Sequence, residues 1–185
     1  DKALQKRIIE EGESCIADLY ITADAGRLGA FQEKGMFQRA SSSSLKNAIP
    51  SNFRSPYWYG IAKRARVIYY DPSRTNPPSD LSYEDLADSK YKGKVVIRKS
   101  NNVYNQSLVA SLIANNGKKK TAEWAKGIVS NMARKPKGND RAQILAVAAG
   151  EADYAVANTY YIALMLSGKK GPEQKAAAKK VKPFF

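Results

Sequence analysis

The chain lacks histidine altogether and has a single cysteine, Cys15, among its 185 residues. The imidazole and thiolate groups that usually bind zinc or copper are therefore almost absent. Without histidine, the chain offers neither a Ser-His-Asp nor a Cys-His catalytic arrangement, and it has no glycine-rich phosphate loop. We therefore expect a protein that is not an enzyme. Cys15 lies in the apolar run CIADLYITA, which predicts a buried thiol.

Acidic residues are also scarce, with 17 Asp and Glu against 31 Lys and Arg, so the formal net charge is +14. Such an excess can indicate a nucleic acid or another anionic partner. The lysines are spread over expected loops and helix ends, however, which favours a solvated basic face and predicts no nucleic-acid partner. Tyr57, Trp58 and Tyr59 could stack on bases, but a strand with a turn glycine explains YWYG more simply.

Long apolar runs are missing too, because none approaches the ~18 residues that a membrane-spanning helix needs. The chain opens on the polar stretch DKALQKRIIEEGE, which has none of the features of a signal peptide. We expect that a signal was removed or that the sequence begins inside a longer protein. The ending VKPFF resembles the start of a strand with no partner after it, which also predicts a fragment.

Tyrosine, in contrast, is abundant, with eleven residues. Tyr160 and Tyr161 stand side by side just after a strand-like run at residues 154–157. A phenolate is a hard, anionic oxygen ligand of the kind that a hard trivalent cation such as ferric iron prefers. Adjacent aromatic residues beside a strand are more often packing residues, so the pair alone does not decide between the two roles.

Predicted helices and strands alternate along the chain, which favours an α/β fold with a largely parallel sheet. The serine-rich residues 41–45 are expected to form a flexible loop. Ser82 and Asp85 resemble a capping box at the start of a short helix. Helices are predicted at residues 2–11, after 24, at 103–116, 120–133, 140–149 and 160–166, and after 172; strands are predicted at 15–23, 57–61, 65–70, 95–98 and 154–157.

Ligands of open α/β sheets bind where the carboxyl ends of strands lead into helices. Two such loops carry tyrosine here: one leads from the strand at 95–98 to Tyr104, and the other leads from the strand at 154–157 to Tyr160 and Tyr161. A helix N-terminus offers free N–H groups and a partial positive charge, which favour an anion. A metal ion bound by phenolates together with an anion is therefore physically coherent at this edge.

Three segments carry a family resemblance: KRARVIYYD, SYEDLADSKYKGKVVIRKSNNVYNQSLVASLIANNG and AVAAGEADYAVANTYY. Together they resemble the periplasmic ferric-iron-binding proteins of bacterial iron ABC transporters, in the tyrosine-rich, cyanobacterial-type branch. The resemblance implies a two-lobed, type II-like periplasmic binding protein fold, with mostly parallel sheets, flanking helices and hinge strands between the lobes. It implies that residues 1–66 are the remainder of the first lobe, 67–180 the second lobe, and 181–185 the start of a crossover back to the first.

The same resemblance implies roles for individual residues. Tyr104, Tyr160 and Tyr161 match metal ligands for Fe(3+), and three phenolates would balance its three charges. Either Arg64 or Arg66 matches an arginine that neutralises or holds a synergistic anion such as carbonate, and the other is expected in a salt bridge or on a strand face. Asn158 matches an anion-holding position, although capping of the following helix explains it equally well.

The chain also departs from the family pattern. Ala23 stands where another branch has a carboxylate ligand, and the adjacent Asp24 is better explained as a helix cap. Asp140 stands where that branch uses an anion-binding asparagine. An acid there would repel an anion, so Asp140 is predicted to cap its helix.

The resemblance implies a monomeric periplasmic protein that delivers ferric iron to an ABC transporter permease in the inner membrane. The alternative is a binding protein for an anion or a small organic solute. In that case the same tyrosines would form hydrogen bonds to the ligand or stack on it.

Overall fold

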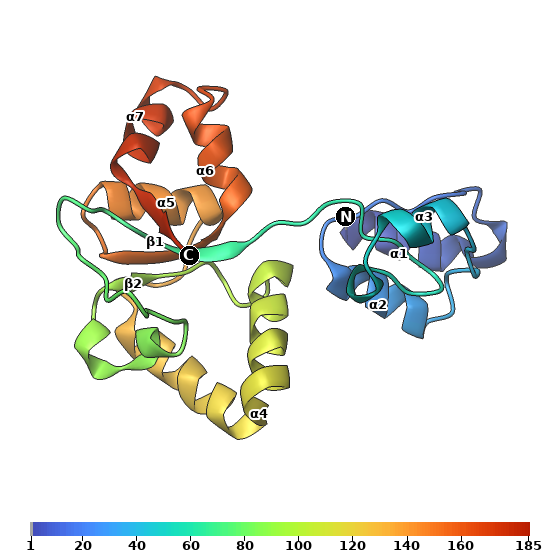
Figure 1. The fold of residues 1–185 in the computed structure, drawn as a ribbon, viewed down its shortest axis with the longest axis horizontal. Coiled ribbons are helices and arrows are strands. Elements are labelled where there is room, and N and C mark those ends of the chain that lie inside the picture. Colours follow the sequence, from blue (N-terminus) through green and yellow to red (C-terminus); the bar gives the residue numbers. More distant parts are fainter. Residues whose placement is uncertain (1) are drawn as a thin grey trace. The chain divides into compact units, whose positions relative to one another are not determined.

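The computed structural model describes residues 2–185, which form two compact units, Asp1–Lys63 and Arg64–Phe185. The described part of the first unit contains three α-helices: α1 (Lys2–Glu11), α2 (Ala25–Glu33) and α3 (Ser43–Ala48). Short 3-10 turns follow α1 and α3, and extended segments connect the helices (Figure 1). Helix α1 begins and ends as predicted, and Asp24 caps α2 as predicted, because its side chain accepts a hydrogen bond from the Gly26 N–H at 3.0 Å.

The strands predicted at residues 15–23 and 57–61 are wrong, because the described part of the first unit contains only an isolated bridge between Arg54 and Tyr59. Residues 15–23 are irregular, and Ile16 is 87% exposed. An apolar run forms a strand only where a neighbouring strand satisfies its backbone groups. For the same reason Cys15 is half-buried rather than buried, and it is a free thiol.

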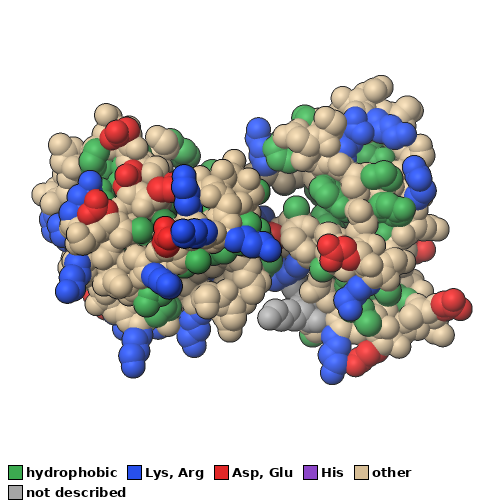
Figure 2. All heavy atoms as spheres, turned by 90° about the horizontal axis from the view of Figure 1, so that it is seen from below, with side chains coloured by type: hydrophobic (Ala, Val, Ile, Leu, Met, Phe, Trp, Pro, Cys, Tyr) green, Lys and Arg blue, Asp and Glu red, His purple; other side chains and the backbone are tan. Residues whose placement is uncertain are grey.

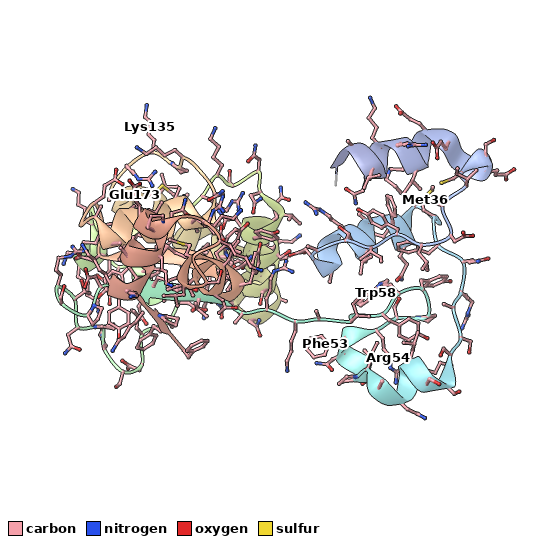
Figure 3. All side chains as sticks on the ribbon, turned by 90° about the horizontal axis from the view of Figure 1, so that it is seen from above. Met36, Phe53, Arg54, Trp58, Lys135 and Glu173 are labelled. Carbon is pink, nitrogen blue, oxygen red and sulfur yellow. The ribbon has the colours of Figure 1, made fainter. Side chains whose placement is uncertain are left out.

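The serine-rich loop prediction is also wrong, since α3 forms there. Ser42 supplies the cap by accepting a hydrogen bond from the Leu45 N–H at 3.2 Å, which satisfies one of the free N–H groups at the helix start. The small core of this unit is centred on the buried ring of Phe31, which packs against Tyr20 and Phe37. Trp58, labelled in Figure 3, donates a hydrogen bond to Gln32 at 3.1 Å and so ties the chain after α3 to α2.

The second unit is built on a four-stranded sheet in the order β2-β3-β1-β4. The strands are β1 (Arg66–Tyr70), β2 (Val95–Val96), β3 (Tyr154–Asn158) and β4 (Lys182–Phe184). Strands β2 and β3 are parallel, but β1 runs antiparallel to both β3 and β4. The expectation of a mostly parallel sheet therefore needs correction. Helical crossovers lead from β2 to β3 and from β3 to β4, so these three strands run in the same direction. Strand β1 has no helical crossover to either of its neighbours in the sheet, β3 and β4, and it runs in the opposite direction.

Helices cover both faces of this sheet (Figure 1). Helices α5 (Asp140–Ala148), α6 (Thr159–Leu166) and α7 (Pro172–Lys180) lie on one face. Helix α4 (Val103–Asn131) and the 3-10 turn η3 (Asp85–Ala87) lie on the other. Strand residues alternate between the two cores: Val67 and Tyr69 pack on the α5–α7 side, and Ile68 packs on the α4 side, as the period of a strand requires.

Two local predictions are confirmed in this unit. Helix α4 breaks at Gly117, which has φ 80° and ψ 161°, so the predicted stop and restart of the helix occur where the glycine permits them. Ser82 and Asp85 form the predicted capping contacts, because the Asp85 carboxylate accepts from the Ser82 N–H at 2.7 Å and the Ser82 hydroxyl accepts from the Asp85 N–H at 3.3 Å. Among the described helices, none is both long and apolar enough to cross a bilayer.

Candidate metal centre

The three candidate tyrosines lie at the starts of two helices that follow neighbouring parallel strands. Tyr104 is the second residue of α4, and Tyr160 and Tyr161 are the second and third residues of α6. Asn102 caps α4 by accepting a hydrogen bond from the Tyr104 N–H at 3.0 Å. Because β2 and β3 are parallel, their carboxyl ends share one sheet edge, and the loops that follow bring the two helix starts together.

The hydroxyl groups of Tyr104 and Tyr160 are in direct contact. Tyr160 Oη donates a hydrogen bond to Tyr104 Oη at 3.2 Å, across 56 residues of sequence. Small cations in octahedral sites hold each oxygen at about 2.0–2.1 Å, so adjacent ligand oxygens lie about 3 Å apart. The two phenol oxygens therefore already have a separation that suits binding to one cation.

Tyr161 completes the cluster. Its ring stacks on the Tyr160 ring with centroids 4.2 Å apart and an interplanar angle of 30°. Tyr160 is 38% exposed, and Tyr104 and Tyr161 are half-buried, so solvent reaches the cluster. Core tyrosines differ: Tyr154 is 5% exposed and packs edge-on against Tyr91, and burial raises the pKa of Tyr154 to about 12.

The Tyr160 phenol resists ionisation in the free protein. Loss of surrounding water raises its pKa well above the ordinary value, and hydrogen bonding with Tyr104 and Tyr161 raises the pKa further. The neutral phenols can share a hydrogen bond, whereas several phenolates this close would repel one another. A bound trivalent cation would remove that repulsion and stabilise the ionised forms.

Two arginines lie over the ring of Tyr104. The guanidinium carbon of Arg64 is 4.7 Å from the ring centroid, and that of Arg98 is 5.5 Å from it. Both separations are within the range of a cation–π interaction. Arg98 was not among the residues predicted from the sequence; the available signal was a charged residue at the end of the buried run VVIR, which leads into the tyrosine loop.

Arg66, in contrast, points into a buried polar network. Its Nη1 donates to Asp140 Oδ2 at 2.9 Å and to Asn158 Oδ1 at 3.3 Å. Its Nη2 donates to Asn105 Oδ1 at 2.7 Å. Of the two arginines in the KRAR motif, Arg66 therefore forms the salt bridge, and Arg64 is the one that contacts a candidate ligand ring.

Asp140 does not cap its helix, so that prediction is wrong. Asn139 is the cap, and it accepts a hydrogen bond from the Ala142 N–H at 3.3 Å. Asp140 is fully buried and pairs with Arg66 and Arg98, at 2.9 and 3.1 Å. The physical reason is charge: a buried carboxylate needs buried cations, and the adjacent strand ends supply two.

The Asn158 side chain does not cap α6. The capping role, which was the alternative to holding an anion, is therefore wrong, and the anion-holding role stays a prediction. The residue is 1% exposed, and its Nδ2 has no hydrogen-bond partner among the described residues. Arg66 Nε, on the neighbouring strand, is buried and lacks a partner in the same part of the chain. These two buried donors, on residues that pair across β1 and β3, fit a small anion or a water molecule.

Carboxylate or sulfur sites do not compete with this cluster in the described chain, where no group of three or more Asp, Glu, Cys or His residues could hold a metal ion. In Figure 2, Lys and Arg side chains are scattered over the visible face of the second unit, on the left, with Asp and Glu among them. This distribution is typical of a solvated basic face.

The fold, with a candidate tyrosine site at the carboxyl ends of parallel strands, is typical of the α/β class of binding proteins. The family model described as "Bacterial extracellular solute-binding protein" matches residues 14–181. The chain belongs to this family, and the predicted periplasmic binding protein fold is confirmed.

Several relatives of known name are similar to this chain. The chain is 50% identical to iron uptake protein A1 of Synechocystis, over 98% of this chain and 51% of the relative. It is similar to the structure of Trichodesmium IdiA (FutA) in complex with iron and citrate ligands, with a TM-score of 0.94, 52% identity, and coverage of 100% of this chain and 58% of that chain. The ferric binding protein from Campylobacter jejuni gives a TM-score of 0.92 at 40% identity, covering 100% and 59%. The chain thus spans about half the length of the curated relatives it matches.

Proposed function

We propose that this chain is part of a periplasmic binding protein that binds ferric iron through the phenolates of Tyr104, Tyr160 and Tyr161. The protein acts as a monomer, has no enzymatic activity, and delivers the ion to an ABC transporter permease in the inner membrane. The observation that carries the proposal is the 3.2 Å contact between the hydroxyls of Tyr104 and Tyr160, with Tyr161 stacked beside them.

The chemistry of the cluster supports a hard trivalent cation. Three phenolates supply three negative charges on oxygen, and the chain has no histidine and one half-buried cysteine to attract softer metals. The helix starts that carry the tyrosines stabilise negative charge near their N-termini. Arg64 and Arg98 place positive charge over the Tyr104 ring, 4.7 and 5.5 Å from its centroid.

The named relatives support the same ligand. Iron uptake proteins A1 and A2 of Synechocystis are 50% and 45% identical to this chain, and the Trichodesmium structure is described with iron and citrate ligands. A synergistic anion such as carbonate would add oxygen ligands to the ion. We assign Arg64, Arg66 and Asn158 to that anion. The two arginines supply positive charge, and Arg66 Nε and Asn158 Nδ2 are buried donors without a partner in the described chain.

The second candidate function is the binding of an anion or a small organic solute. The same unpartnered donors, Arg66 Nε and Asn158 Nδ2, favour it, and the tyrosines would then form hydrogen bonds to the solute or stack on it. Ferric iron remains the better proposal because it explains why three phenol groups meet at one point.

A ferric titration followed by visible absorption tests the proposal. The 185-residue chain is titrated with ferric nitrilotriacetate at neutral pH in the presence of carbonate. We expect a broad phenolate-to-iron band that weakens in Tyr104→Phe, Tyr160→Phe and Tyr161→Phe. Tyr70→Phe is the matched control, because Tyr70 is half-buried and packs against Phe184, away from the cluster.

The outcomes separate the two functions. No band with folded wild-type chain would contradict iron binding by these three residues. Tight binding of carbonate, phosphate or citrate without colour, measured by calorimetry, would favour the anion function. A band of equal strength in all four variants would place the iron at other ligands.

A further inference from the structure

The buried carboxylate of Asp140 connects the two helix starts that carry the tyrosines. Three donors converge on it: Arg66 Nη1 at 2.9 Å, Arg98 Nη1 at 3.1 Å, and the backbone N–H of Asn158 at 2.8 Å. Asp140 is 0% exposed, and the Arg66 side chain is 9% exposed. In such surroundings each hydrogen bond restricts geometry strongly, because an unpaired buried charge is very costly.

One arm of the network runs from Asp140 to the start of α4. Arg66 Nη2 donates to Asn105 Oδ1 at 2.7 Å, and Asn105 Nδ2 donates to the Arg98 carbonyl at 2.6 Å. Asn105 is 6% exposed and directly follows Tyr104. This arm therefore fixes the first turn of α4 against the ends of β1 and β2.

The other arm runs to the start of α6. The Asn158 N–H that donates to Asp140 belongs to the last residue of β3, two residues before Tyr160. The Asn158 side chain also accepts from Arg66 at 3.3 Å. Because both arms depend on the same carboxylate, the separation of the two helix starts depends on it as well.

We propose that Asp140 is the positioning residue of the tyrosine cluster: its carboxylate fixes Tyr104 through Arg66 and Asn105, and Tyr160 and Tyr161 through the backbone of Asn158. The functional meaning of this role rests on the proposed function, but the geometry can be tested without iron. Ligand groups must be held within about 0.5 Å of their binding positions, and that precision comes from the residues behind them.

The test compares ring contacts in the iron-free 185-residue chain. With tyrosine rings isotopically labelled and assigned through Tyr→Phe variants, NMR reports the proximity of the Tyr104 and Tyr160 rings. We expect Asp140→Asn to abolish this cross-peak. The cross-peak between Tyr160 and Tyr161 is an internal control, because these rings stack within one helix and do not depend on the network.

Asp153→Asn is the matched control variant. Asp153 also contacts two cations, Arg74 and Lys94, each at 3.9 Å, but its side chain is 33% exposed and belongs to neither arm. We expect both ring contacts, Tyr104–Tyr160 and Tyr160–Tyr161, to remain in this variant. If Asp140→Asn fails to fold, Asn105→Ala decides the question, because it removes only the α4 arm and should weaken the same cross-peak while leaving the Tyr160–Tyr161 contact.

A Tyr104–Tyr160 cross-peak that persists in folded Asp140→Asn, or in Asn105→Ala where Asp140→Asn does not fold, would overturn the proposal. With iron, Asp140→Asn should bind roughly 10–100-fold more weakly than wild type, as is usual when a residue that orients a metal ligand is lost. If wild-type chain binds no iron but the cross-peak still disappears in Asp140→Asn, the proposed function fails while the positioning role stands.

Discussion

Iron binding by phenols must release protons, and the number released is a direct count of the phenol ligands. A tyrosine phenol has an ordinary pKa of about 10, and the environment of Tyr160 raises its pKa further. The Tyr160 phenol is therefore protonated in the free protein at neutral and acidic pH. Each phenol that becomes a ligand exchanges its proton for the metal.

The number of protons released sets how steeply the iron affinity depends on pH. If three phenols lose their protons, the apparent iron affinity falls about 1000-fold for each pH unit of acidification, apart from the carrier's own chemistry. That is about 1.4 kcal/mol of binding free energy per proton and per pH unit. Replacing any one ligand tyrosine by phenylalanine should leave two protons and a fall of about 100-fold per unit.

The assay is a competition titration against a fixed concentration of ferric nitrilotriacetate at several values between about pH 5 and pH 7, well below the phenol pKa. Protonation of the carrier contributes equally to every protein, so it cancels when the slope of a variant is subtracted from that of wild type. We expect a slope difference of one proton for Tyr104→Phe, Tyr160→Phe and Tyr161→Phe, and no difference for Tyr70→Phe.

Equal slopes for wild type and all three variants would refute the reasoning, because the iron would then bind without displacing these protons. A difference of one proton in only two variants would reduce the ligand set to two phenols. The direction of the pH effect is also predicted. The difference in iron affinity between wild type and each ligand variant should shrink as pH falls, because the variant has one phenol fewer to deprotonate.

Three further predictions concern the stability of the second unit. Gly127→Ala should lower the urea midpoint despite a better helix propensity of about 1 kcal/mol, because its Cβ would lie 2.6 Å from the Ala87 carbonyl oxygen; an unchanged midpoint would contradict this close approach. Leu86→Ala, at a 0% exposed position, should cost about 2–5 kcal/mol in the same assay, whereas Leu166→Ala, at a 40% exposed position, should cost little. Hydrogen bonds from Ser82 lower the pKa of Asp85. The contribution of Asp85 to stability is therefore present above the carboxyl's unfolded pKa and is lost as pH falls through the folded pKa. The difference in Tm between wild type and Asp85→Asn should close on acidification, and a constant difference would argue against this linkage.

Local signals in the sequence predicted local structure well wherever the competing interactions were also local. The glycine at position 117 predicted a helix break because only glycine enters that backbone region without strain, and φ there is 80°. Asp24 and the Ser82–Asp85 pair predicted their caps because the donor and acceptor lie within a few residues. The strand predicted at residues 15–23 failed because a strand depends on a partner that the run itself cannot specify.

The features of the candidate site also divide into those that the sequence predicted and those that it did not. Composition and motif position were enough to predict the chemistry of the candidate ligands, since a chain without histidine but with tyrosines at two strand-to-helix loops offers hard oxygen ligands. Three features came from the folded chain alone. Tyr104 and Tyr160 meet at 3.2 Å, Arg66 turns inward while Arg64 lies over the Tyr104 ring, and Asp140 is a buried ion-pair partner rather than a cap. These contacts join residues 39–92 positions apart. Their geometry is set by strand order and register, which no short motif encodes.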